Sequence, residues 1–136
     1  MKEKLKGILL YEKLEVEEML NLMDIQYRLL LSGDPLEIQN ITTKLDQASR
    51  KIAKLEISRR ELLQGKEIKT YIHEENDEEL DSLYRRLKQL VQLSIYQKDT
   101  NEVLLKQSIS YTSRIIGILN PDRTIKTYNA YGRVGR

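Results

Sequence analysis

The chain has 136 residues, of which 40% are hydrophobic and 32% charged, and its formal net charge is +2. The absence of cysteine excludes disulfides and thiolate chemistry, and so small a net charge gives no basis for a nucleic-acid partner. All eight aromatic residues are tyrosines, and the chain has only 6 glycines and 2 prolines. This composition is typical of long amphipathic helices, and the length suffices for one domain with its own core.

No segment has the pattern of a targeting or membrane sequence. The apolar run Ile8–Tyr11 is too short for the core of a signal peptide. No other run approaches the roughly 18 apolar residues that a membrane helix requires. We therefore expect a soluble, cytoplasmic protein that does not insert into a membrane.

The first predicted helix covers about residues 3–31. Apolar residues recur along it at seven-residue intervals, as Leu9, Val16, Met23 and Leu30. After it, Gly33 favours a left-handed helix end, and Asp34 followed by Pro35 favours a new helix start. Glu37 lies three residues beyond Asp34, which predicts a capping box. So short a connection between two long helices predicts an antiparallel hairpin.

The second predicted helix covers about residues 35–64. Its apolar positions alternate steps of three and four residues, as Ile38, Ile41, Leu45, Ala48, Ile52 and Leu55. Arg59 interrupts this spacing, Leu62 resumes it, and Gly65 is expected to end the helix. Three such heptads indicate coiled-coil-like packing against the first helix.

The stretch 66–77 is ambiguous, because a helical turn, a loop and a short strand each fit its pattern. Asn76 or Asp77 can cap a third helix over residues 77–119, in which Leu80, Leu83, Leu87 and Leu90 keep the heptad spacing. Polar residues then occupy the same seam, at Ser94, Gln97 and Asn101. A kink or a new helix start near Asp99 is an open alternative, because residues 99–102 also resemble a capping box.

The C-terminal half of the third helix carries two adjacent apolar rows. One contains Leu104, Ser108, Tyr111, Ile115 and Ile118, and the other contains Leu105, Ile109, Thr112, Ile116 and Leu119. A helix of about 43 residues spans on the order of 65 Å, against nearer 45 Å for each of the first two. The hairpin therefore cannot cover all of it. Either a partner covers the remaining apolar face, or the face is core, buried by the chain itself or by a second copy in a homodimer.

The predicted fold is all-α: an antiparallel helical hairpin and a long third helix form a coiled-coil-like three-helix bundle, with residues 1–119 as a single helical domain. Residues 120–136 are basic and poor in aliphatic side chains, which predicts a flexible tail. Its only aromatic residues are Tyr128 and Tyr131.

Catalytic and metal-binding patterns are missing from the sequence. We find no phosphate-binding loop and no nucleophile–base arrangement. His73 is the only histidine, which excludes the paired Glu-x-x-His motifs of di-iron bundles, and we interpret it as an exposed loop residue. We therefore predict that the protein is not an enzyme and has no cofactor and no metal site.

The chain resembles the flagellar export chaperones of the FlgN type over nearly its full length. The resemblance is carried by the long N-terminal helix, by SGDPLEIQNITTKLDQ at the start of the second helix, and by NEVLLKQSISYTSRIIGIL in the third. In the last segment the matching positions are Asn101, Leu104, Leu105, Gln107, Ser108 and Tyr111. The tail segment Tyr128–Gly132 is also similar, whereas Ser94, Gln97 and the pair Ile115–Ile116 depart from many relatives.

The resemblance implies a chaperone that binds terminal helical segments of hook-associated (hook-filament junction) proteins and delivers them to the flagellar type III export gate. The expected client-binding residues are Leu104, Leu105, Ser108, Ile109, Tyr111, Thr112, Ile115, Ile116 and Leu119. Tyr128 and Tyr131 are candidates for a contact with the export gate. Two alternatives stay open: a structural coiled-coil adaptor, and a prefoldin-like chaperone in which residues 66–77 form strands.

Overall fold

The computed structural model describes residues 1–119, and it is helical throughout. Within that range the elements are α1 (Lys2–Ser32), α2 (Pro35–Leu63), α3 (Ile68–Glu75) and α4 (Glu78–Leu119). The prediction of an all-α protein is confirmed. No strand occurs between residues 1 and 119, so the prefoldin-like alternative has no β-platform there. The predicted tail, residues 120–136, lies outside the described residues.

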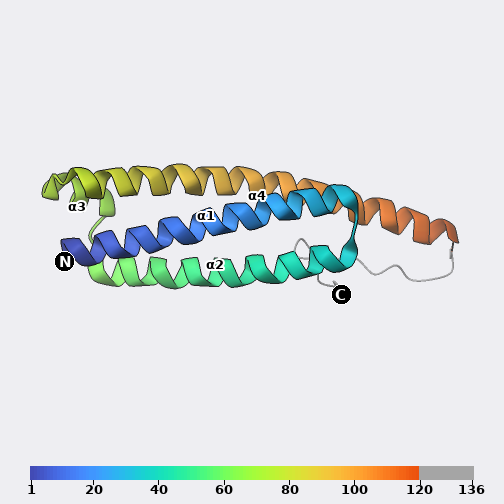
Figure 1. The fold of residues 1–136 in the computed structure, drawn as a ribbon, viewed down its shortest axis with the longest axis horizontal. Coiled ribbons are helices and arrows are strands. Elements are labelled where there is room, and N and C mark those ends of the chain that lie inside the picture. The colour runs from blue at the N-terminus through green and yellow to red at the C-terminus, as the bar shows by residue number, and fades with distance from the viewer. Residues whose placement is uncertain (120–136) are drawn as a thin grey trace.

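The long helices lie side by side, with α1 between α2 and α4 (Figure 1). The extensive helix–helix contacts are those of α1 with α2 and of α1 with α4. Helix α2 returns antiparallel to α1, whereas α4 runs parallel to it, since Lys6 pairs with Asp77 and Asn101 contacts Met23. α1 is therefore the central element of the fold.

The turn between α1 and α2 follows from two consecutive residues. Gly33 takes a left-handed conformation with φ of 78°, and its backbone N–H donates to the carbonyl of Leu29. The Asp34 side chain accepts hydrogen bonds from the backbone N–H groups of Leu36 and Glu37. The predicted capping box is only half formed, because the Glu37 side chain makes no return bond to Asp34 among the described residues.

The ambiguous stretch 66–77 contains a short helix. α2 ends at Leu63, with Gln64 as a left-handed cap at φ 50°, and α3 follows from Ile68. Tyr71 and Ile72 on α3 are buried in the main core, so packing accounts for helicity that the local pattern left undecided. His73 is exposed, but it lies on α3, and its interpretation as a loop residue is wrong. α4 is continuous through residue 99, with no break there.

Two groups of apolar side chains form the core. The larger joins α1, α3, α4 and the end of α2, and its members are Leu5, Leu9, Val16, Leu63, Tyr71, Ile72, Leu80, Leu87 and Leu90. The smaller joins α1 to α2 through Leu22, Ile41 and Ala48, with Met19, Leu29 and Leu45 packed against it.

One buried ion pair connects α1 to α2. Nη1 of Arg59 lies 3.1 Å from Oε2 of Glu12, whose residue is 4% exposed. The other oxygen of Glu12 is buried without a hydrogen bond among the described residues. Burial raises the pKa of Glu12, and the nearby Arg59 charge opposes that rise. The interruption of the α2 apolar spacing at Arg59 is thus explained by its partner on α1.

A second set of charges holds the start of α4 against α1. Asp77 caps α4 by accepting a hydrogen bond of 3.0 Å from the Leu80 N–H, and its other oxygen lies 3.1 Å from Nζ of Lys6. Lys2 lies 3.4 Å from the same oxygen. The Leu80 N–H bond, followed by the Lys6 ammonium, lowers the pKa of Asp77 to about 2.

We predict that Arg59→Met lowers the free energy of unfolding at pH 7 by about 3 kcal/mol, because it leaves the Glu12 carboxylate buried and unpaired. Protonation removes that buried charge, so the deficit should shrink as the pH falls towards the raised pKa of Glu12. The double variant Glu12→Leu with Arg59→Met should recover more than half of the loss. Urea denaturation of the three proteins measures these values, and a double variant as unstable as Arg59→Met would contradict the assignment.

We also predict how Asp77 contributes to acid stability. A carboxyl whose folded pKa is depressed stabilises the fold above its unfolded value of 3.8, and that contribution is lost as the pH falls from there towards about 2. Asp77→Asn keeps an acceptor for the cap but removes the charge. The difference in unfolding free energy between the wild type and Asp77→Asn should therefore narrow between pH 5 and pH 2. A constant difference across acid titration by circular dichroism would refute this role.

Candidate functional site

Helix α4 continues beyond the end of the hairpin. It has 42 residues, against 31 in α1 and 29 in α2. Asn101 lies level with Met23 and Gln26 of α1, because its side chain contacts both. With equal rise per residue, Ser32 at the end of α1 lies level with about residue 109 of α4. Roughly ten residues, on the order of 15 Å of helix, therefore extend past the hairpin (Figure 1). We call residues 110–119 the α4 extension.

The structure describes only part of the predicted client-binding set. Leu105 is buried, Leu104 is half-buried, and their neighbour Val103 is 55% exposed. For the rest of the set the helical backbone is described but the side chains are not: Ser108, Ile109, Tyr111, Thr112, Ile115, Ile116 and Leu119. Tyr128 and Tyr131 lie outside the described residues altogether.

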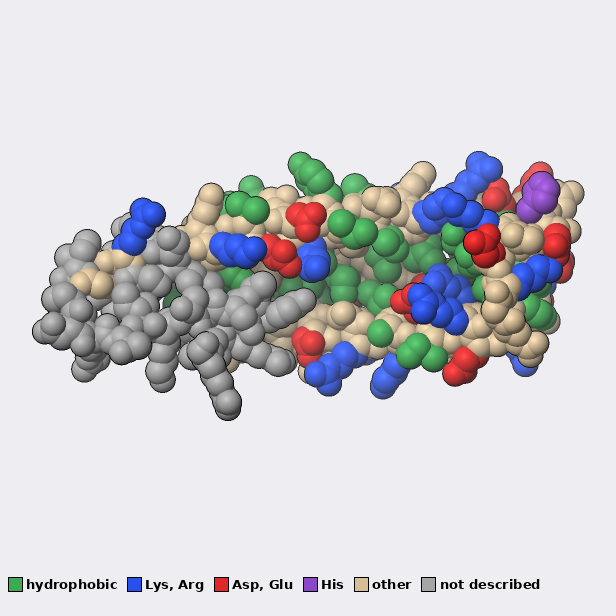
Figure 2. Space-filling view, turned by 180° about the vertical axis from the view of Figure 1, so that it is seen from behind, with side chains coloured by type: hydrophobic (Ala, Val, Ile, Leu, Met, Phe, Trp, Pro, Cys, Tyr) green, Lys and Arg blue, Asp and Glu red, His purple; other side chains and the backbone are tan. Residues whose placement is uncertain are grey.

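A groove adjoins the α4 extension on its N-terminal side. It is a cavity of about 310 Å³ between α1, α2 and α4, with Met19, Met23, Leu45 and Leu105 as its apolar lining. Asp46, Lys98 and Glu102 supply charged groups at the same cavity. Figure 2 shows hydrophobic side chains along the hollow between the two outer helices. The groove places Leu105 of the predicted set beside residues of α1 and α2 that the sequence analysis did not name as site residues.

Two exposed apolar residues of α4 precede the groove residues Lys98 and Glu102 in the sequence. Val91 and Ile95 are 39% and 50% exposed, and they precede Lys98 and Glu102 on the same face, at steps of four, three and four residues. The sequence shows the spacing of these apolar residues but not their exposure, so it could not identify this row. The heptad pattern alone places Val91 and Ile95 outside the seam.

Asn101 fixes how α1 and α4 are aligned at the groove. It is 3% exposed, and its Nδ2 donates to the Met23 carbonyl and to Oε1 of Gln26, both at 2.8 Å. Its Oδ1 accepts from Nε2 of Gln97 at 2.9 Å. Nearby, the buried Ser94 hydroxyl donates to the Leu90 carbonyl. The polar seam of α4 is therefore hydrogen-bonded, and a single buried Asn in such a seam specifies register.

The described residues were compared with two further kinds of site, a metal site and a membrane span. Within residues 1–119 no group of three or more acidic or histidine side chains is arranged to hold a metal ion. None of the helices described there combines the length and apolarity needed to cross a membrane. The site consists of a helix whose backbone continues past its neighbours, next to an apolar groove lined also by charged residues.

A family model described as FlgN protein matches residues 1–135. No curated protein and no solved structure matches the chain. The family match covers almost the whole sequence, and it confirms the resemblance drawn from the residues.

We predict that Asn101→Ala lowers the free energy of unfolding by about 2 kcal/mol, because the buried acceptors on Met23 and Gln26 lose their donor. Asn101→Leu fills the volume of the Asn101 side chain but offers no hydrogen-bond donor. It should therefore change the alignment of α1 with α4 more than it changes the free energy of unfolding. Urea denaturation measures the first effect. Distance measurements between spin labels on α1 and α4 measure the second, and a single unchanged distance in Asn101→Leu would contradict the role of Asn101 in alignment.

Proposed function

The chain belongs to the FlgN family of flagellar export chaperones, and on this premise we propose that it binds terminal helical segments of hook-associated (hook-filament junction) proteins. In this proposal it is a cytoplasmic protein, prevents premature aggregation of these segments, and delivers them to the flagellar type III export apparatus. It acts by binding alone, without an enzymatic step or a cofactor, and nucleic acid has no part in it.

The observation that carries the proposal is the continuation of α4 past the hairpin. An amphipathic client helix presents apolar side chains at i, i+3, i+4 and i+7, which is the spacing of the two rows on α4. Each apolar anchor buried in such a contact contributes roughly 1.5–3 kcal/mol, less the cost of ordering the client. Several anchors along two rows are therefore enough for a specific complex that can still be released at the export gate.

We place the client on the predicted set: Leu104, Leu105, Ser108, Ile109, Tyr111, Thr112, Ile115, Ile116 and Leu119. Leu105 lies at the groove, so a client helix on the extension can continue between α2 and α4, against Met19 and Leu45. Lys98 and Glu102 at the same groove can orient a charged client residue. Tyr128 and Tyr131 remain the candidates for the export-gate contact.

A direct test is a calorimetric titration with the terminal helical segment of a hook-filament junction protein. Ile115→Asp combined with Ile116→Asp should weaken binding by at least ~30-fold, because two buried apolar anchors become charged. The matched control is Leu36→Asp with Ile57→Asp, since those residues are 70% and 56% exposed on α2. The control should bind like the wild type.

Equal affinity of the Ile115/Ile116 double variant and the wild type would refute the assigned surface. Light scattering separates the remaining candidates. A stable oligomer that ignores the client would support the structural adaptor and contradict the chaperone. A homodimer that dissociates when the client is added would instead support the proposal, with the second copy covering the same rows.

A further inference from the structure

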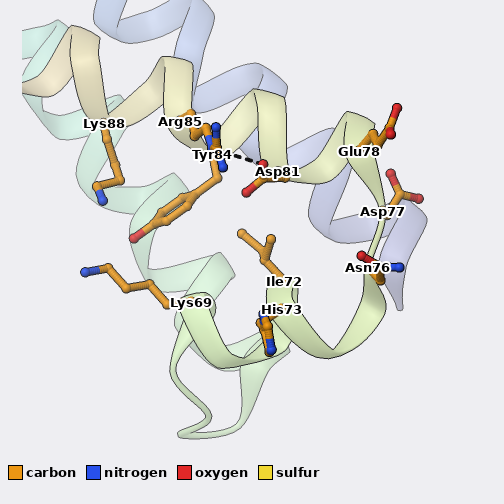
Figure 3. Close-up of a pocket in the computed structure, with 10 residues that line it drawn as sticks. All are labelled: Lys69, Ile72, His73, Asn76, Asp77, Glu78, Asp81, Tyr84, Arg85 and Lys88. Carbon is orange, nitrogen blue, oxygen red and sulfur yellow. Dashed lines mark ion pairs between the residues drawn. The ribbon is translucent and has the colours of Figure 1, made fainter.

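A second cavity lies at the opposite end of α4 from the α4 extension. It measures about 420 Å³ and is formed between α3 and the first turns of α4. Figure 3 shows that Ile72 and the ring of Tyr84 face each other across it. Ile72 is 5% exposed and belongs to the main core, against which Tyr84 packs. The centre of this cavity is therefore apolar and anchored in the core.

Two lysines lie at one edge of this cavity, and neither pairs with an acidic residue in the described part of the chain. Lys69 comes from α3 and Lys88 from α4, and Figure 3 shows both ammonium groups on the same side as the Tyr84 hydroxyl. Nζ of Lys88 lies 5.4 Å from the centroid of the Tyr84 ring, a cation–π distance that restrains it there. Among the described side chains, no carboxylate lies within 4.0 Å of either ammonium, although Arg85 pairs with Asp81 at 3.0 Å nearby.

The charges around the cavity limit what it can bind. Its lining contains three basic residues, Lys69, Arg85 and Lys88, and three acidic residues, Asp77, Glu78 and Asp81. A polyanion such as nucleic acid would meet the acidic edge and be repelled, so the site does not fit one. A single carboxylate next to an apolar side chain fits both the lysine edge and the apolar centre.

We propose that this cavity binds a carboxylate-bearing peptide segment of a partner protein. The carboxylate lies between Lys69 and Lys88 and accepts a hydrogen bond from the Tyr84 hydroxyl, while an adjacent apolar side chain packs against Ile72. Because both lysines are exposed, each ion pair adds little, and the contact is a weak and salt-sensitive docking interaction. The proposal does not depend on the client site, which lies at the other end of α4.

The test uses the full chain labelled with ¹⁵N at low ionic strength. Three probes are titrated: a blocked peptide Ala-Leu-Glu-Leu-Ala, the same peptide with Gln in place of Glu, and inorganic phosphate. The Glu peptide should shift the amide resonances of Lys69, Ile72, Tyr84 and Lys88. It should bind roughly threefold to tenfold more tightly than the Gln peptide, as one charge-assisted contact predicts. Phosphate should bind no better than the Gln peptide.

The matched variants separate this site from general charge effects. Lys69→Gln with Lys88→Gln should abolish the difference between the two peptides while leaving the circular dichroism spectrum unchanged. Lys51→Gln with Lys54→Gln removes the same charge from exposed positions on α2 and should retain that difference. Equal shifts by both peptides, no shift near the cavity, or phosphate binding as tightly as the Glu peptide would each overturn the proposal.

Discussion

Helix α1 is the surface on which both other long helices pack, and the rest of the structure depends on that double contact. Its buried residues serve both neighbours: Leu22 joins the cluster with α2, whereas Leu5 and Leu9 join the cluster with α3 and α4. Because α2 and α4 both bury their apolar faces against α1, they need no extensive contact with each other. The space left between them is the groove at Met19 and Leu45. The groove is thus a consequence of how α1 shares its buried residues between its two neighbours.

Leucine seams alone would be compatible with registers displaced by one heptad. Polar contacts between the helices disfavour those registers. The Glu12–Arg59 pair aligns α1 with α2, and Asn101 aligns α1 with α4. Such buried polar groups contribute more to register than to stability. The register of α1 and α4 has a structural consequence. It determines how far α4 passes Ser32, and hence the length of the α4 extension.

Local signals account for what could be predicted from the sequence. Gly33 and Asp34 produce the turn through their own backbone and side-chain hydrogen bonds. The apolar spacing of the long helices is visible in any short stretch of their sequence. The local sequence pattern does not determine the conformation of the short helix α3, because its helicity depends on burying Tyr71 and Ile72. The pairing of Glu12 with Arg59 joins residues 47 apart, which no local pattern encodes. The rows of residues 104–119 follow from spacing, but the groove beside them depends on which helices meet.

We propose that the apolar rows on the α4 extension are open to water in the free protein. The chain has no cysteine, so single cysteine variants report exposure without background. Reaction of Ile115→Cys with a thiol reagent should be nearly as fast as that of Val103→Cys, which replaces a residue 55% exposed. It should be far faster than that of Leu87→Cys, whose site is 3% exposed. Labelling of Ile115→Cys as slow as that of Leu87→Cys, in dilute monomeric protein, would contradict the account.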